Sequence, residues 1–359
     1  MIKKKKIALI ELTSYHEECL YSQIQFLIKS NYDLTLILNP KNNSNIEFYG
    51  VARENIILFN PRSSSFILKR ITNWFSLYRF IIKSDFKKVI FNTASSNKEV
   101  IALTKYLPKR IKCYGIIHNL KKLNRSTSQK IVSQRITEYY VLNDFLTNSA
   151  DIENDNIKLS SFYPIFFPQY DSEQVPKNNN QIWICIPGEL NYKRRDYEVI
   201  LNALSYLAPT DHLKIILLGK MDYKKPDTVQ FLKHAEQLGL LKYLVTFDNF
   251  IPNTVFHEYI KKSEYIMAPV SLTEQNYLAY KITGAYNLAF AYKKPLICPK
   301  ELIVIPDLQL TSYFYENAKN LSQLLEQISE GTLNPKTYYD NPKWSFKAQQ
   351  KKYLDLLEN

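Results

Sequence analysis

The sequence predicts an α/β protein made of two Rossmann-like domains. Its 359 residues correspond to about two domains at the usual ~150 residues each. Short apolar runs alternate with longer helical patterns along the chain, which is typical of βαβ units and a parallel sheet. Proline, asparagine and charged residues interrupt this rhythm at residues 160–181 and indicate a linker. We therefore expect an N-terminal domain at residues 1–170, a second domain at 171–340 and a C-terminal helix at 341–359.

The basic N-terminus resembles a signal peptide, but its apolar stretch ends after four residues at Glu11 and is better interpreted as a first strand. The expected strands of the first half are residues 6–12, 34–38, 56–59, 88–92, 113–118 and 139–142, with helices at 18–29 and 98–107. The second half repeats the rhythm, with strands at 182–187, 213–219, 245–249, 265–269 and 295–298, and helices at 197–207, 283–292 and 344–357.

Composition limits the classes of function. Seven glycines in the whole chain leave no GxGxxG or GxxxxGK[ST] phosphate loop. A formal net charge of +13 favours an anionic partner, and nucleic acid, a membrane surface and a phosphorylated substrate all qualify. The four widely spaced cysteines are interpreted as buried free thiols in a reducing compartment, and no apolar run approaches the ~18 residues that span a bilayer. We expect a cytoplasmic protein.

Two histidines follow strands of the first half, at the sheet edge where ligands bind in such folds. His16 lies beside Glu17 and Glu18 and could act as a general base whose pKa a carboxylate raises. The alternative is a surface histidine in a loop where Thr13 or Ser14 caps the next helix. His118 could contact a substrate hydroxyl or phosphate, or simply end its strand. The other three histidines, at positions 212, 234 and 257, have no partner at ligand spacing and are expected to be structural.

Two segments of the second half could bind an anion. Lys193, Arg194 and Arg195 lie between a strand and a helix, although a run of charges is more often a solvated face. Thr283 and Gly284 begin another helix, where small residues let backbone N–H groups approach a phosphate. The sequence contains no DxD pair and no His or Cys at metal-ligand spacing, so we expect no metal, and the charge of a leaving group would be met by cations and helix dipoles.

In their order and spacing, four segments of the second half resemble the nucleotide-sugar domain of a GT-B glycosyltransferase. The segments are residues 186–195, 215–220, 245–269 and 283–297, and His16 and His118 extend the likeness into the first half. The chain is similar to the bacterial family-4-like transferases of surface polysaccharide assembly. It departs from them at the E-x7-E motif, where Tyr280 and Leu288 replace the two glutamates, so neither ribose recognition nor retaining stereochemistry carries over.

The resemblance implies two domains facing each other across a cleft, with the C-terminal helix packing back on the first. A nucleoside diphosphate sugar would bind the second domain, and a glycan or lipid-linked acceptor the first. Lys193, Arg194 or Arg195 would stabilise the departing diphosphate without a metal, together with the helix end formed by Thr283, Gly284 and Ala285. The remaining nucleotide contacts implied are Gly188, Gly219, Asn249, Ile251 and Tyr280.

For an inverting enzyme, the resemblance implies that His16, with Glu17, activates the acceptor hydroxyl. For a retaining enzyme, His118 would instead hold the sugar or diphosphate. No cofactor is implied beyond the co-substrate.

Residues 63–83 bear on partners. Ile67, Ile71, Trp74, Tyr78 and Ile81 share one helical face, with cations elsewhere, which suits an anionic membrane surface and a peripheral location. A helix that covers the sheet would look much the same. The alternatives for the whole protein are a basic nucleic-acid-binding α/β protein, a sugar-nucleotide epimerase of the GT-B fold, or a non-catalytic relative. The absence of a recognisable nucleic-acid motif argues against the first.

Overall fold

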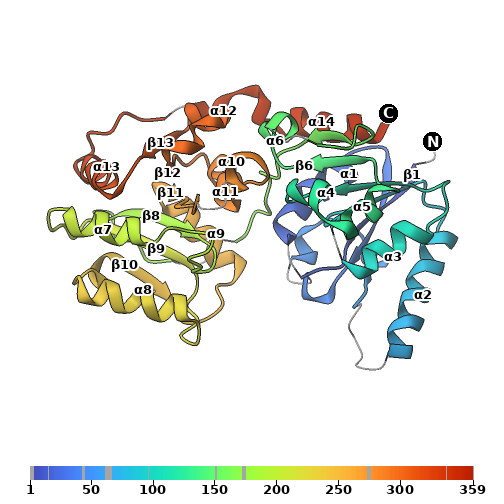
Figure 1. Ribbon diagram of the computed structural model, residues 1–359, viewed down its shortest axis with the longest axis horizontal. Coiled ribbons are helices and arrows are strands. Elements are labelled where there is room, and N and C mark those ends of the chain that lie inside the picture. The colour runs from blue at the N-terminus through green and yellow to red at the C-terminus, as the bar shows by residue number, and fades with distance from the viewer. Residues whose placement is uncertain are drawn as a thin grey trace. The chain divides into compact units, whose positions relative to one another are not determined.

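The computed structural model describes residues 4–14, 16–42, 45–60, 67–95, 97–149, 152–171, 175–272, 276–336 and 338–358. Figure 1 shows the chain, which divides into two compact units. Unit 1 comprises Met1–Pro168 together with Pro342–Asn359, and unit 2 comprises Gln169–Asn341. The boundary expected between residues 170 and 171 lies beside this division.

Unit 1 is built around a parallel sheet in the order β3-β2-β1-β4-β5-β6-β7. Its strands are β1 (Lys5–Glu11), β2 (Tyr32–Leu38), β3 (Ile56–Leu58), β4 (Lys88–Phe91), β5 (Lys112–Ile116), β6 (Glu138–Val141) and β7 (Lys158–Ser161). Its helices are α1 (Leu20–Ile28), α2 (Ile67–Lys83), α3 (Lys98–Tyr106), α4 (Lys121–Arg125), α5 (Thr127–Ser133) and α6 (Phe145–Ser149). The sequence did not predict β7, whose first three residues are not buried and so give no apolar run.

Unit 2 has a second parallel sheet, in the order β10-β9-β8-β11-β12-β13. Its strands are β8 (Ile182–Pro187), β9 (Leu213–Lys220), β10 (Leu244–Phe247), β11 (Tyr265–Met267), β12 (Leu296–Pro299) and β13 (Ser312–Tyr315). Its helices are α7 (Glu198–Tyr206), α8 (Pro226–Gln237), α9 (Asn253–Lys262), α10 (Asn276–Ala279), α11 (Gly284–Tyr292), α12 (Pro306–Gln309) and α13 (Ala318–Glu330). The sequence did not predict β13, which contains three aromatic residues but no aliphatic one.

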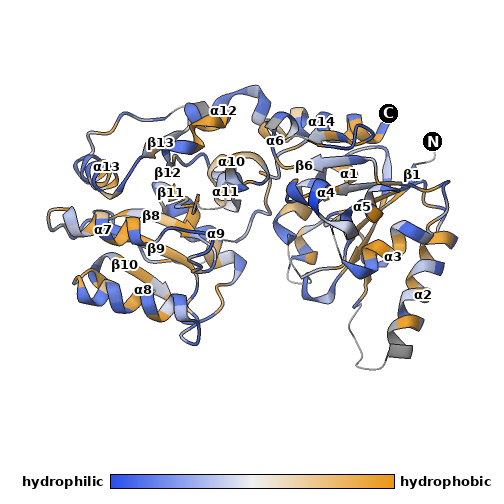
Figure 2. Cartoon of the chain, in the orientation of Figure 1, coloured by the Kyte–Doolittle hydropathy of each residue, from blue (hydrophilic) through white to orange (hydrophobic). Residues whose placement is uncertain are grey.

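Each sheet reverses its strand order at one place. In unit 1 the reversal lies between β1 and β4, and in unit 2 between β8 and β11. The loops after these strands diverge, and a ligand can bind between them at the carboxyl edge of the sheet. The central strands are buried on both faces, as Ile7 to Ile10 of β1 illustrate. Figure 2 shows the hydrophobic colour on this strand.

The C-terminal helix α14 (Phe346–Glu358) packs on α1 and β7 of unit 1. Tyr353 and Leu357 are completely buried, and the ring of Tyr353 stacks on Tyr140 with centroids 4.5 Å apart. The side-chain oxygen of Gln349 accepts a hydrogen bond from the Tyr163 backbone N–H at 3.0 Å. The expectation that the last helix packs on the N-terminal domain is confirmed.

Candidate active site

Two histidines meet at the switch point of unit 1. His16 follows β1 and His118 follows β5, and their rings stack with centroids 3.6 Å apart and planes 11° from parallel. The His16 backbone has a left-handed φ of 65°, where the chain turns into the short 3-10 helix Glu17–Cys19. His16 itself occupies the cap position of that helix and makes no side-chain capping bond, so the alternative of a cap at Thr13 or Ser14 is wrong.

The carboxylate that contacts His16 belongs to Glu18 and not to Glu17. Nδ1 of His16 lies 3.2 Å from Oε1 of Glu18. Glu17 turns the other way and accepts hydrogen bonds from Asn45 Nδ2 at 2.9 Å and from the Tyr49 hydroxyl at 3.3 Å. The expected pairing of His16 with Glu17 is therefore corrected, because the left-handed turn at His16 brings the second carboxylate, not the first, onto the ring.

The ionised state of Glu18 is favoured by this contact. Desolvation raises the pKa of Glu18, but the hydrogen bond to His16 and the attraction of that ring outweigh it and lower the pKa below its ordinary value. An ionised carboxylate only accepts, so Nδ1 of His16 donates to it. In neutral His16 the lone pair then lies on Nε2, which is the nitrogen able to take up a proton.

The backbone fixes the tautomer of His118. Its Nε2 lies 2.8 Å from the carbonyl oxygen of Asn92, which follows β4. A carbonyl accepts only, so Nε2 carries the proton and Nδ1 carries the lone pair. Burial and the neighbouring His16 lower the pKa of His118 to about 3. His118 is thus neutral at physiological pH, and it presents a hydrogen-bond acceptor rather than a charge.

Beneath the histidines lies a buried polar network that the sequence analysis missed. Glu11 ends β1 with no exposed surface and accepts hydrogen bonds from Asn92 Nδ2 at 2.7 Å and from the Thr93 hydroxyl at 2.6 Å. Its other oxygen accepts from the backbone N–H and hydroxyl of Thr13 at 2.6 and 2.7 Å. Burial raises the pKa of Glu11, and these four donors oppose the rise.

Asn92 links this network to both histidines. Its Nδ2 also donates to the backbone oxygen of His16 at 2.9 Å, and its own backbone oxygen receives His118. One asparagine at the end of β4 therefore holds the backbone of His16 and the ring of His118. The sequence did contain a signal for Asn92, because it is a polar residue directly after a buried strand. The same pattern led to His16 and His118.

In unit 2, the run of three cations lies at the switch point between β8 and β11. Asp196 N–H donates to Pro269 O at 2.7 Å, and Ser271 N–H donates to Arg194 O at 2.9 Å. Arg195 pairs with Val270 in an isolated antiparallel bridge. The loop after β8 is therefore held against the loop after β11, at the edge where a ligand would bind.

The three cations do not have equal roles. The Arg195 guanidinium donates to the backbone oxygens of Pro187 and Glu189, and to the Tyr197 hydroxyl at 3.3 Å. It holds the turn after β8 together, and the predicted diphosphate contact of Lys193, Arg194 or Arg195 stays a prediction. Lys193 and Arg194 are exposed. Arg194 and Arg195 lie near Tyr277 of α10, where burial raises the tyrosine pKa and the two arginines oppose the rise.

Gly188 and Gly219 shape the same turn. Gly188 has a φ of 97°, which L residues rarely adopt. A Cβ on Gly219 would lie 2.5 Å from the Gly188 oxygen, so the end of β9 approaches this turn too closely for any side chain. The structure explains both glycines by backbone packing, and their predicted role in nucleotide binding stays a prediction.

The N-terminus of α11 is accessible. Gly284 is exposed, and a Cβ added to it would meet nothing within 4 Å. Thr283 is the cap residue and makes no side-chain capping bond, whereas Ala285 is buried and could contribute only its backbone. In the next turn, Asn287 is 4% exposed, and its side-chain oxygen has no hydrogen-bond partner among the described residues. The sequence analysis did not single out Asn287.

The predicted base-contacting segment follows β10. Asn249 is exposed and Ile251 is buried, while Phe250 between them has 79% of its surface exposed. Tyr223, after β9, donates from its hydroxyl to Asp248 at 2.5 Å. Tyr280 follows α10 and is partly buried. The nucleotide contact of Asn249, Ile251 and Tyr280 stays a prediction.

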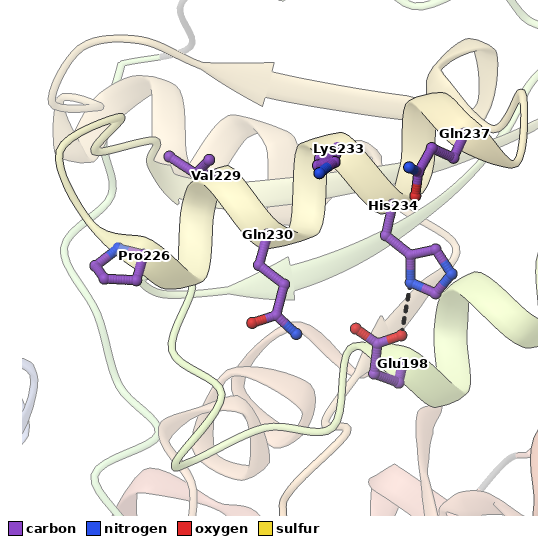
Figure 3. A pocket seen from close by; sticks show the side chains of 7 residues that line it. All are labelled: Glu198, Pro226, Val229, Gln230, Lys233, His234 and Gln237. Carbon is purple, nitrogen blue, oxygen red and sulfur yellow. Dashed lines mark ion pairs between the residues drawn. The ribbon is translucent and has the colours of Figure 1, made fainter.

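The remaining histidines have protein partners. Nδ1 of His212 lies 3.0 Å from the Asn180 backbone oxygen, and that of His257 lies 2.6 Å from the Tyr292 hydroxyl. Figure 3 shows His234 of α8 with its ring 2.7 Å from Glu198 of α7, beside a groove of about 610 Å³. The groove contains none of the predicted site residues.

Among the described residues, no group of three or more His, Cys, Asp or Glu is placed to hold a metal.

No family model and no curated protein sequence matches the chain, but solved structures match it over its whole length. A glycosyltransferase from Rickettsia africae aligns over 99% of both chains, with a TM-score of 0.64 and 15% identity. HepE from Anabaena, determined with UDP and glucose, aligns over 99% of both chains, with a TM-score of 0.68 and 12% identity. The chain has the GT-B fold.

The GT-B fold is not confined to transferases. The UDP-GlcNAc 2-epimerase of Neisseria meningitidis, determined with UDP-GlcNAc, covers 99% of this chain and 100% of its own, with a TM-score of 0.59 and 12% identity. The α/β GT-B fold predicted from the sequence is confirmed. Because one fold carries different chemistries, the activity must be argued from the site.

Proposed function

We propose that this protein is a glycosyltransferase that moves a sugar from a nucleoside diphosphate sugar to a hydroxyl of a glycan or lipid-linked acceptor. The observation that carries the proposal is the pair of His16 and His118, oriented by Glu18 and Asn92 at the switch point of unit 1. HepE and the Rickettsia transferase, which share the fold over the full chain, support it.

In unit 1 the acceptor hydroxyl would donate its proton to Nε2 of His16. Glu18 would stabilise the imidazolium that forms, as a carboxylate does beside a catalytic histidine. His118 helps by staying neutral, because a second positive ring at 3.6 Å would oppose protonation of His16. Its Nδ1 is left to accept a hydrogen bond from a substrate hydroxyl. This assignment belongs to an inverting reaction; in a retaining one, His118 would hold the sugar instead.

In unit 2 the departing diphosphate would be met by Arg194, by Lys193 and by the N-terminal N–H groups of α11 at Thr283 and Gly284. Asn249, Ile251 and Tyr280 would contact the nucleoside. Among the described residues the buried side-chain oxygen of Asn287 has no hydrogen-bond partner, and because buried polar groups are normally paired, a ligand at this helix end would supply one.

The first experiment is a thermal-shift comparison of UDP, GDP, dTDP and CMP. A nucleotide that binds only the folded protein at a hundredfold excess over Kd stabilises it by ~2.7 kcal/mol, so one of the four should raise the Tm clearly. Activity with the matching sugar nucleotide is expected to survive EDTA. Loss of activity in EDTA with recovery on adding Mn²⁺ or Mg²⁺, or a Tm shift with single-stranded nucleic acid alone, would contradict the proposal.

An epimerase is the second candidate, because two structures that match nearly all of the chain are UDP-GlcNAc 2-epimerases. The two activities differ in their need for an acceptor. An epimerase converts its sugar nucleotide alone, and proton NMR of UDP-GlcNAc with the enzyme would show the new isomer. A transferase leaves that spectrum unchanged until an acceptor is added, and the anomeric proton of the product then distinguishes inversion from retention.

A further inference from the structure

Two apolar side chains of α2, Ile71 and Phe75, are left exposed by the described part of the structure. Ile71 and Phe75 have 47% and 52% of their surface exposed, whereas Leu77 and Ile81, toward the other end, are buried in the core. Figure 1 shows α2 extending past α3, and Figure 2 shows hydrophobic colour on several turns of its coloured part. The C-terminal half of the helix therefore contributes buried side chains to unit 1. Residues 63–66 of the predicted segment lie outside the described residues.

Aromatic side chains from α2 and α3 form one patch on this surface. Trp74 stacks on Tyr78 with centroids 5.3 Å apart and contacts Tyr106 of α3 edge-on at 5.9 Å. The Tyr78 hydroxyl donates to the Tyr106 backbone oxygen at 3.2 Å. Tyr106 is itself 55% exposed. We call Ile71, Trp74, Phe75, Tyr78 and Tyr106 the aromatic patch.

Cations surround the aromatic patch. Exposed cations of α2, of the C-terminal end of α3 and of the turn after it are Arg79, Lys83, Lys105, Lys109 and Arg110. Nζ of Lys105 lies 5.5 Å from the ring centroid of Tyr106, and Arg110 donates to the Ile82 oxygen at 3.1 Å, which ties the turn to α2. The nearest acidic residue after α2, Asp85, pairs with Lys87 at 2.8 Å. Between Glu54 and Asp85 the sequence contains no acidic residue.

We propose that the aromatic patch and its cations bind the headgroup region of an anionic phospholipid bilayer. Tryptophan, tyrosine and phenylalanine beside lysine and arginine suit the boundary between headgroups and acyl chains, where the rings bury apolar surface and the cations meet lipid phosphates. No helix in the described part of the chain is long and apolar enough to cross a membrane. The contact is therefore with the membrane surface, and α2 lies along it.

Charge favours lipid over a second copy of this chain. A two-fold interface brings the same patch of both copies together, so the five cations would face five others. An anionic bilayer instead attracts each of them, by ~1 kcal/mol per cation near the surface. The full chain, with a formal charge of +13, adds long-range attraction in the same direction.

Flotation of the full-length protein with vesicles tests the proposal. We expect binding to vesicles of phosphatidylcholine and phosphatidylglycerol in equal parts, much weaker binding to phosphatidylcholine alone, and loss of binding as salt screens the charges. The double variant R79Q/K83Q should lower the partition coefficient about fivefold per cation. Equal binding to both vesicle types, or no salt dependence, would overturn the proposal.

Phe75→Ser tests the apolar contribution, with Tyr206→Ser as its control, because Tyr206 is 58% exposed at the end of α7 in unit 2. Only Phe75→Ser should weaken vesicle binding.

The fluorescence of Trp74 offers a second readout, because the other two tryptophans, Trp183 and Trp344, are buried. The emission of the protein should shift to the blue with anionic vesicles, and this shift should be absent in Trp74→Phe. If Phe75→Ser alters the oligomeric state and leaves vesicle binding unchanged, the patch joins two copies and the proposal fails. Nucleotide-induced Tm shifts are measured on the same variants and should not change.

Discussion

A carboxylate beside a histidine decides which ring nitrogen can take up a proton, and for His16 that carboxylate is Glu18. Glu18→Gln removes the charge that would stabilise the imidazolium, while a side-chain oxygen remains to accept from Nδ1. We expect kcat to fall by about one to two orders of magnitude, a part of the 10²–10⁴ that a general base supplies. The pH profile of kcat should change with it, which a purely structural role would not cause.

Glu17→Gln is the matched control, since Glu17 contacts Asn45 and Tyr49 on the other side of the backbone. It should lower the Tm slightly and leave the pH profile of kcat unchanged. Equal kinetic effects of the two variants would remove Glu18 from the mechanism.

Adjacent arginines provide a second test at single residues. Arg194→Ala should raise the nucleotide Kd and lower the rate by ~30- to 1000-fold, as expected when a charge-assisted donor to a developing oxyanion is lost. Arg195→Ala should instead lower the Tm, because the backbone oxygens of Pro187 and Glu189 lose their donor. We expect the free energy of unfolding to fall by about 2 kcal/mol. Calorimetry and nucleotide titration of both variants separate the two outcomes. An Arg194→Ala variant with ordinary nucleotide affinity would show that the diphosphate binds elsewhere.

The sequence could predict His16 and His118 because each follows a buried strand. A residue that follows a strand of a parallel sheet lies at the carboxyl edge of that sheet, where ligands bind. It could not predict how Glu11 and Asn92 meet, since they are 81 residues apart and their contact depends on the pairing of β1 with β4. The choice between Glu17 and Glu18 also depended on one backbone angle at His16, which composition and spacing do not reveal.

At the scale of elements, α14 is connected to the candidate site by hydrogen bonds. The Tyr353 hydroxyl donates to Gln23 Oε1 at 3.1 Å, and Gln23 Nε2 donates to Asn92 Oδ1 at 2.6 Å. Asn92 in turn holds His16 and His118. The last helix, α1 and the ends of β1, β4 and β5 therefore form one hydrogen-bonded path. Tyr353 and Gln23 are positioning residues in this path, because they act on the histidines only through Asn92.

Tyr353→Phe should show this coupling. Removing the hydroxyl leaves buried Gln23 Oε1 without its donor, so we expect a loss of about 1–3 kcal/mol in stability together with a lower kcat. Tyr140→Phe is the control, because its hydroxyl donates only to the Tyr353 backbone oxygen at 2.7 Å, outside the path. Both variants should lose stability, and only Tyr353→Phe should lose activity beyond that. Normal kcat in folded Tyr353→Phe would break the proposed link.

Most elements of the two sheets follow from the alternation of apolar and helical patterns, and the exceptions have physical causes. Strands β7 and β13 lie at sheet edges, where one neighbour is missing and aliphatic residues are fewer. The amphipathic pattern of α2 suited both a core helix and a membrane helix. In the structure Leu77 and Ile81 of its C-terminal half are buried, whereas Ile71 and Phe75 are exposed, and the membrane contact stays a prediction.

At the scale of the whole molecule, each unit contains one histidine whose burial keeps it neutral. In unit 1, burial and His16 lower the pKa of His118 to about 3. In unit 2, burial and Lys261 lower the pKa of His257 to about 4. Both groups titrate at 6.5 in the unfolded chain. Between these values the unfolded state binds more protons than the folded state, so stability rises with pH and is lost as pH falls.

The Tm should therefore decrease as the pH falls from about 7 to about 5, where both histidines are protonated only in the unfolded chain. His118→Gln and His257→Gln each remove one of the two contributions to the pH dependence of stability. In each variant the Tm should change less steeply with pH than in the wild-type protein. Because the two residues lie in different units, the double variant should flatten this dependence by the sum of the two effects. A wild-type Tm that stays constant over this range would mean that both histidines gain their protons as easily in the folded protein as in the unfolded chain.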